Sequence, residues 1–243
     1  MRNHIFSAFI LLLAIFLGAC SEKDLDQDEV MEKVKDTIDD VESYHTEWDV
    51  AMEMDDLEMD QTEHSSVNMD IDAIESSNEL RQTVEESDDA NQSVVEYYMI
   101  EDTMYVNDND SGWVNESINT IDIQENLTLS YKKIATLLEE IEDELEMETD
   151  DDHYILTFKG SSQNVFDAQD EPYSLEVTGF DEDGVNQDLK IKVDKENLYI
   201  MNVENTVTAK NNQNELEMKI VQDFSDINAI DEIELPEEIE EEV

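Results

Sequence analysis

The stretch Glu47-Trp-Asp-Val-Ala-Met-Glu-Met54 places an apolar side chain at every second position. Successive side chains of a β-strand point to opposite faces, so this pattern predicts a strand with one buried face and one wet face. Residues 66–72 repeat the alternation with Val67, Met69 and Ile71. We expect the two segments to be neighbouring antiparallel strands. The alternating apolar residues of the first strand are Trp48, Val50, Met52 and Met54.

Outside these two strands the chain changes between helical and strand periodicity. Apolar residues at helical spacing predict amphipathic helices over residues 30–41 and 127–145. Further strands are expected at 80–84, 94–106, 113–114, 154–158, 173–177, 189–193, 198–207 and 216–220. Only 5 Gly and 2 Pro interrupt the chain, which favours long strands. We predict one α+β domain over residues 29–240 that ends in a frayed acidic tail.

The N-terminus has the features of a secretory signal. Arg2 precedes an apolar run from Ile5 to Leu17, which is too short for a comfortable transmembrane helix of about 20 residues. The closing residues Leu17, Gly18, Ala19 and Cys20 resemble the lipobox of bacterial lipoproteins. That resemblance implies cleavage of residues 1–19, a diacylglycerol on the Cys20 thiol and acylation of the new amino group.

Cys20 is the single cysteine of the chain, so it has no disulfide partner within it. We therefore expect a lipid anchor on the outer face of a bacterial cell membrane, Gram-positive by the resemblance described below. Residues 20–28 would be the lipidated Cys and a polar tether.

The chain is strongly acidic, with 67 Asp and Glu against 13 Lys and Arg and a formal net charge of −54. This charge repels nucleic-acid phosphates and anionic headgroups, so nucleic acid is excluded as a partner. The acidic residues are spread along the whole chain, which favours a solvated surface adapted to high external salt over a dedicated divalent-cation binder. Both interpretations stay open from the sequence.

Signatures of catalysis or of a bound cofactor are missing from the sequence. His45, His64 and His153 lie far apart, without a ligand partner at metal spacing. Loops centred on Gly112 and Gly184 do not match an EF-hand, because position twelve would be Ile118 or Lys190 instead of Glu. Nucleophile-elbow and phosphate-loop motifs are absent. We expect no enzyme, no cofactor and no metal centre, with weak Ca²⁺ binding left open at the Asp108/Asp110 and Asp181/Asp183 turns.

Three short motifs and the order of elements resemble the LolA/LppX-like lipoproteins, in particular an uncharacterised Gram-positive branch. The motifs are Met104-Tyr105-Val106, Gly112-Trp113, and Phe224-Ser225-Asp226 followed by Leu235-Pro236-Glu237-Glu238. The resemblance implies a curled antiparallel half-barrel covered by amphipathic helices. In that group the concave cavity takes acyl chains of lipids or lipoproteins. The basic residues with which those relatives dock a partner have no evident counterpart here.

The resemblance and the alternating strands together give candidate cavity residues: Trp48, Val50, Met52, Met54 and Met69. Flexible methionine side chains are suited to adaptable apolar sites. The leading hypothesis is a lipid or hydrophobic-ligand binding lipoprotein with an acyl lipid as ligand. The alternatives are a non-enzymatic structural or interaction lipoprotein with a filled core and an envelope protein as partner, or weak divalent-cation binding.

Overall fold

The computed structural model describes residues 24–100, 103–117, 131–173, 180 and 184–240. The predicted signal and the lipobox residues Leu17, Gly18, Ala19 and Cys20 lie outside these ranges. So do the first residues of the predicted 127–145 helix, Leu175 and Val177 of a predicted strand, and the Asp181/Asp183 turn.

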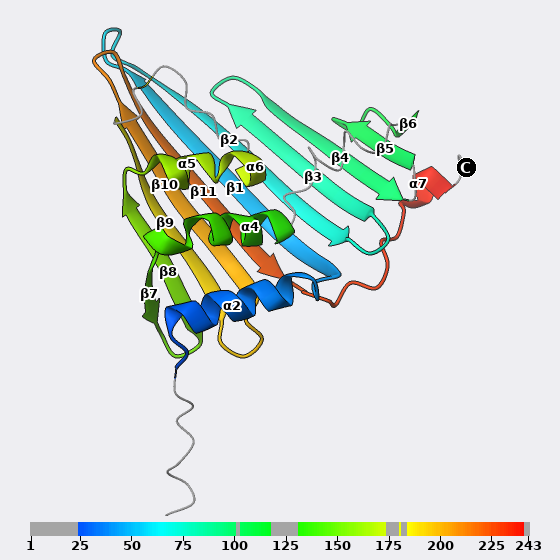
Figure 1. Cartoon of the computed structure of the whole chain (residues 1–243). Helices are drawn as coiled ribbons and strands as arrows, with labels where there is room; N and C mark the ends of the chain where they lie inside the picture. Colours follow the sequence, from blue (N-terminus) through cyan, green and yellow to red (C-terminus); the bar gives the residue numbers. More distant parts are fainter. Residues whose placement is uncertain (1–23, 101–102, 118–130, 174–179, 181–183, 241–243) are drawn as a thin grey trace, which may run out of the picture.

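The described strands form one antiparallel sheet in the order β6-β5-β4-β3-β2-β1-β11-β10-β9-β8-β7 (Figure 1). Strand β11 pairs with β1, so the last strand joins the two halves of the chain. Within the described part of the chain, the edge strands β6 and β7 each pair with one neighbour only, so the curled sheet is open. The antiparallel α+β fold is therefore as predicted. The strands are β1 (Ser43–Asp56), β2 (Gln61–Ile74), β3 (Glu79–Asp88), β4 (Gln92–Ile100), β5 (Thr103–Asp108), β6 (Val114–Ser117), β7 (Glu146–Thr149), β8 (His153–Gly160), β9 (Val185–Asp194), β10 (Ile200–Lys210) and β11 (Asn214–Ser225).

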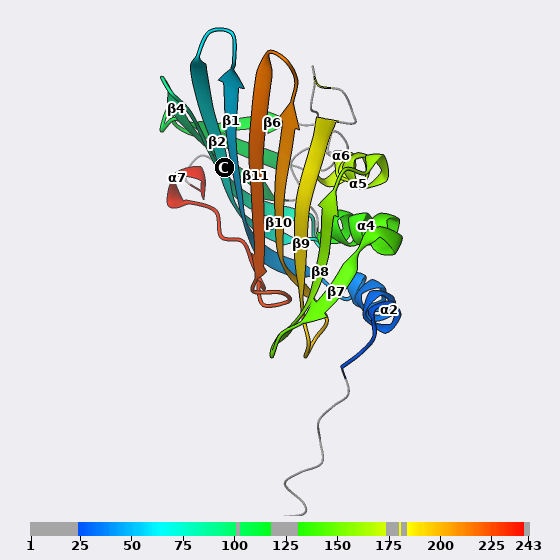
Figure 2. The ribbon, with the colours of Figure 1, turned by 90° about the vertical axis from the view of Figure 1, so that its left-hand side faces the viewer.

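Helices cover one face of the sheet, which we call the inner face (Figure 2). They are α2 (Gln27–Ile38), α4 (Tyr131–Ile141), α5 (Gln163–Asp167) and α6 (Asp170–Tyr173), and a 3₁₀ turn, η1 (Glu142–Glu144), follows α4. The opposite, outer face carries the C-terminal segment, residues 226–240, with α7 (Glu237–Glu240) at its end.

The core lies between the inner face and helices α2 and α4. Helix α4 buries Ile134, Leu138 and Ile141 completely or nearly so. Tyr131 packs edge-on against Phe224 of β11, and its hydroxyl accepts a 2.8 Å hydrogen bond from the backbone N–H of Ile200. Helices α2 and α4 thus cover the inner face at their end of the sheet. A binding site on the inner face would have to lie on the part that these helices leave uncovered.

Four predictions about the elements need correction. Helix α2 begins at Gln27, because Asp26 and Glu29 form a capping box, and ends at Ile38, so it is shifted from the predicted residues 30–41. Leu145 follows α4 and η1 instead of continuing the helix. Tyr173 ends the short helix α6 and is not in a strand.

The fourth correction concerns the acidic tail, which is not frayed as far as residue 240. Ile233 and Ile239 are buried, with 6% and 1% of their surfaces exposed. They pack with Tyr98 and Tyr105 on the outer face of β4 and β5. These two apolar residues fix the segment despite the acidic residues around them.

Candidate functional site

The five candidate cavity residues all project from the inner face. Trp48, Val50, Met52 and Met54 come from β1, and Met69 comes from the neighbouring position to Trp48 on β2. Each is half-buried. We call these five side chains the apolar band. On the other side of β1, the partners of Met52 and Met54 are Met218 and Leu216 of β11, which extend the apolar surface.

The band continues the core without a break. Trp48, Val50 and Met69 pack against the helix-covered core, whereas Met52 and Met54 lie further toward the turn between β1 and β2. The indole of Trp48 stacks on the ring of Tyr173 in α6, with ring centroids 6.3 Å apart and planes 15° from parallel. Burial raises the pKa of Tyr173, whose hydroxyl donates to Gln222 at 3.2 Å.

Buried polar atoms without partners lie beside the band. The indole Nε1 of Trp48 and the amide Oε1 of Gln82 are buried and have no hydrogen-bond partner. Gln82 is only 2% exposed, and its Nε2 contacts the sulfur of Met69 at 3.3 Å. A buried donor or acceptor without a partner costs about 1–3 kcal/mol, so each one requires an explanation.

A cleft of about 450 Å³ opens at the far end of the band. Met52 and Met54 supply large apolar side chains to its lining. The remaining lining residues are Glu63, His64, Ser65, Asp88, Asp89 and Ala90. The volume lies in the range of small-molecule sites, about 300–1,000 Å³. A groove of about 400 Å³ adjoins the cleft and shares part of its lining, but extends over the outer face around Ala51 and Lys219. A separate polar groove of about 460 Å³ lies between α2 and η1.

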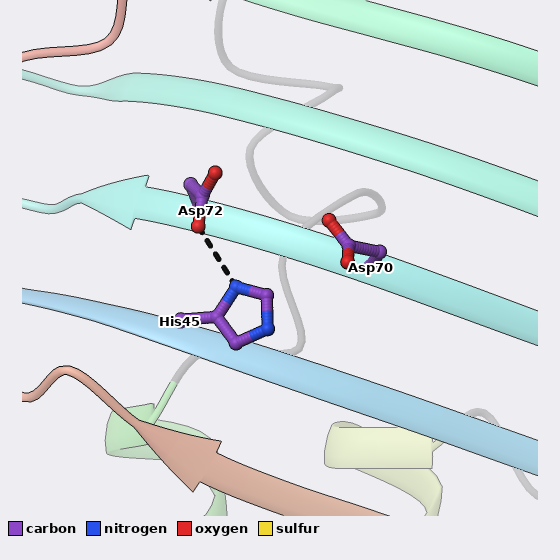
Figure 3. Close-up of side chains that lie close together, drawn as sticks. All are labelled: His45, Asp70 and Asp72. Carbon is purple, nitrogen blue, oxygen red and sulfur yellow. Dashed lines mark hydrogen bonds and ion pairs between the residues drawn. The ribbon is translucent and has the colours of Figure 1, made fainter.

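The outer face carries a second cluster, formed by His45, Asp70 and Asp72 (Figure 3). One potential ligand atom from each residue lies within 4.8 Å of the others. His45 Nδ1 is 2.8 Å from Asp72 Oδ1, and Arg81 donates to Asp72 Oδ2 at 2.9 Å. Burial is the largest influence and opposes the charge of Arg81, but the hydrogen bond to Asp72 and the charge interactions with Tyr98, Asp72 and Asp70 together outweigh it and raise the pKa of the guanidinium.

The guanidinium of Arg81 already supplies the cation of this cluster. It also lies 3.8 Å from Asp70 Oδ1. We therefore interpret His45, Asp70, Asp72 and Arg81 as an ion-pair network between β1, β2 and β3, and assign no metal to it. The spacing argument from the sequence missed this cluster because His45 and Asp72 meet only through the antiparallel register of β1 and β2.

Sequence reasoning also missed Gln82, Tyr173 and the acidic wall of the cleft. Alternation along β3 places Gln82 and Asp88 on the inner face with Val84 between them. That signal was present in the sequence, but the register that brings them beside the band was not. The other predicted Ca²⁺ turn, at Asp108 and Asp110, contributes no residue to the cleft.

No helix in the described part of the chain has the length and hydropathy that crossing a bilayer requires. No curated protein matches the sequence.

Solved structures show only distant similarity. A DUF1329 family protein from Desulfovibrio piger is 13% identical, with 82% of this chain and 90% of that chain covered and a TM-score of 0.24. MucB in complex with MucA(peri) is 6% identical, with 88% and 61% covered and a TM-score of 0.29. A beta-barrel-like DUF1849 protein from Brucella abortus is 9% identical, with 76% and 100% covered and a TM-score of 0.26.

Because these TM-scores are low, the fold is described only by the strand pairing of this chain. The sequence profile of DUF6612, a family of unknown function, matches residues 26–243. This match includes every strand of the sheet and the whole of the apolar band. The chain therefore belongs to the DUF6612 family.

Proposed function

We propose that this protein is a lipid-anchored module that binds a hydrophobic ligand along its apolar band, outside the cytoplasmic membrane. The observation that carries the proposal is the continuity of the band from the core to the cleft at Met52 and Met54. An apolar surface that a monomeric protein leaves half-covered, and that ends in a cleft of ligand size, is typical of a binding site.

Two chemical features of the band support a ligand over a plain core. The three methionines Met52, Met54 and Met69 can adapt their side chains to different apolar shapes. Trp48 Nε1 and Gln82 Oε1, one donor and one acceptor, are buried beside the same surface without hydrogen-bond partners. An amphiphile with an ester, amide or hydroxyl group would satisfy such atoms, whereas more hydrocarbon from the chain itself would not.

The lipid anchor in this proposal is an acyl group on Cys20. Asp24 lies four residues after Cys20 and pairs with Lys195 at 2.8 Å, and the backbone N–H of Leu25 donates to the Tyr154 hydroxyl at 3.1 Å. Four residues span at most about 14 Å. An acylated Cys20 would thus hold the α2 end of the domain against the membrane, while the turn between β1 and β2 lies at the opposite end (Figure 1).

Labelling with a palmitate analogue tests the anchor. We expect the wild-type chain to incorporate the label in a lipoprotein-processing bacterium, and the Cys20→Ala chain to incorporate none, because the thiol is the acceptor of the diacylglycerol. A Ser21→Ala chain serves as the matched control and should be labelled normally. Continued labelling of Cys20→Ala would show that the lipobox is misread.

Native mass spectrometry tests ligand binding. The chain from Ser21 onward retains all described residues; it is prepared in high salt, and lipids are extracted from the same sample. A bound mass that matches an extracted acyl lipid is the expected result. A ligand-free mass that persists after incubation with envelope lipids would contradict the proposal and favour the filled-core interpretation, with a protein of the envelope as partner.

A further inference from the structure

The two faces of the sheet differ in whether their acidic residues are accompanied by basic ones. The Lys and Arg side chains of the described strands all lie on the outer face. Strand alternation and cross-strand register show this placement. Lys219, for example, pairs with Ala51, and Arg81 pairs with Asp72. The full set is Arg81, Lys159, Lys190, Lys192, Lys210 and Lys219.

The inner face has no Lys or Arg from the described strands, and it carries acidic residues along one flank of the apolar band. Glu63 is the cross-strand partner of Met54, and Glu86 is the partner of Val67. Asp88 pairs with Ser65, which in turn pairs with Met52. Adjacent strands lie about 4.8 Å apart, so these carboxylates are one or two strands from the band. We call Glu63, Glu86 and Asp88 the acidic flank; all three are exposed.

Asp88 is held ionised by its own turn. Its Oδ1 accepts hydrogen bonds from the backbone N–H groups of Ala90 and Asn91, each at 2.7 Å. These bonds lower the pKa of the carboxyl group. The flank therefore keeps negative charge beside the cleft, where His64 also contributes to the lining. An anionic headgroup would meet repulsion there, since no Lys or Arg of the described strands lies on this face.

We propose that the ligand of the apolar band is a cationic amphiphile, whose chain lies along Trp48, Val50 and Met52 and whose positive group lies at the acidic flank. This inference rests on the function proposed above and adds the charge of the ligand. The band from Trp48 to Met54 is about 20 Å long, so it accepts an extended chain. The unpaired Gln82 Oε1, in a side chain 2% exposed, is a second acceptor on the same face.

Fluorescence of a single tryptophan can follow binding at the band. The chain has 2 Trp residues, Trp48 in the band and Trp113 in the outer-face cluster. In the Trp113→Phe variant, the emission of Trp48 reports on the band alone. Trp48→Phe, which leaves Trp113, is the control for binding elsewhere. The probes share one chain length and differ in charge: dodecyltrimethylammonium, dodecyl maltoside and dodecyl sulfate, all below their micelle concentrations.

The overall charge of −54 attracts any cation, so the test needs variants of equal charge. Glu63→Gln with Glu86→Gln removes two charges from the acidic flank. Glu85→Gln with Glu217→Gln removes two exposed charges from the outer face of β3 and β11. Titrations at an ionic strength of 0.15 M limit long-range attraction, since the Debye length is then about 8 Å.

We expect the cation to bind about tenfold more tightly than the neutral probe, which is near the upper limit for two exposed ion pairs, and the anion to bind most weakly. The flank variant should lose most of this preference, and the outer-face variant should keep it. Equal affinities for cation and neutral probe, or equal losses in the two variants, would overturn the cationic ligand but leave ligand binding intact. No response of Trp48 to any probe would overturn both.

Discussion

At the scale of single residues, substitution of Met52 and Met54 distinguishes a ligand-binding surface from a purely structural one. Both are half-buried at the cleft, where a ligand chain would cover the remainder of each side chain. Replacing both with Ser should weaken binding of the neutral dodecyl probe by about tenfold or more, because roughly half of the 1.5–3 kcal/mol of a full burial is lost at each position.

The matched control for these two residues is Leu57→Ser with Met59→Ser. Leu57 and Met59 lie in the turn after β1, 45% and 65% exposed and outside the lining of the cleft. Their replacement should leave the affinity unchanged in the same titration. If both pairs of substitutions had the same effect, the ligand would not lie on the inner face.

Three buried tyrosines give the protein a defined response to alkaline pH. Burial raises the pKa of Tyr44, Tyr131 and Tyr173 above the ordinary value of 10.0. Below pH 10 they are neutral in both the folded and the unfolded chain and do not change stability. Above pH 10, ionisation of these tyrosines lowers the free energy of the unfolded chain but not that of the folded chain. The free energy of unfolding should therefore fall.

Absorbance at 295 nm checks this response, since it follows tyrosinate formation. We expect the rings of Tyr44, Tyr131 and Tyr173 to ionise only together with the loss of structure seen by circular dichroism. Full ionisation of all 8 Tyr residues while the fold persists would contradict the burial of these rings.

At the scale of elements, the C-terminal segment is a structural part of the outer face. Ile233 and Ile239 cover Tyr98 and Tyr105, and Trp113 packs edge-on against Tyr98 with centroids 5.3 Å apart. Replacing both isoleucines with Ser should lower the free energy of unfolding by about 3 kcal/mol or more. In a Trp48→Phe background, the emission of Trp113 should also move to longer wavelength, because water reaches the indole.

Glu232→Ser with Glu234→Ser is the control for the segment. These neighbours are exposed, so neither stability nor the emission of Trp113 should change measurably. A stable protein with unchanged emission after loss of both isoleucines would mean that the segment does not cover the outer face.

Comparison of the elements with the sequence patterns shows which features of the fold could be predicted and why others could not. Alternation from Trp48 to Met54 was sufficient to place the band, since a strand has a fixed period of two. Tyr173 was misassigned because its four-residue helix is too short to show helical periodicity. Ile233 and Ile239 were overlooked within an acidic composition, and His45 and Asp72 meet only through strand register, which no local pattern contains.

For the molecule as a whole, the dispersed negative charge should govern stability in salt. With a net charge of −54, mutual repulsion destabilises the compact state, and added salt screens it. We expect the melting temperature of the chain from Ser21 onward to rise steadily from low salt to about 1 M NaCl, where the Debye length is about 3 Å. A melting temperature independent of salt would contradict the interpretation of the charge as salt adaptation.

The same measurement distinguishes salt adaptation from capture of divalent cations. A specific site stabilises the fold by RT ln(1 + [Ca²⁺]/Kd), whereas screening depends only on ionic strength. Because Arg81 already pairs with both carboxylates of the cluster of His45, Asp70 and Asp72, millimolar CaCl₂ at constant ionic strength should leave the melting temperature unchanged. An increase that disappears in Asp70→Asn, but persists when the exposed Asp151 is changed to Asn, would instead locate a cation site on the outer face and revive cation binding as a function.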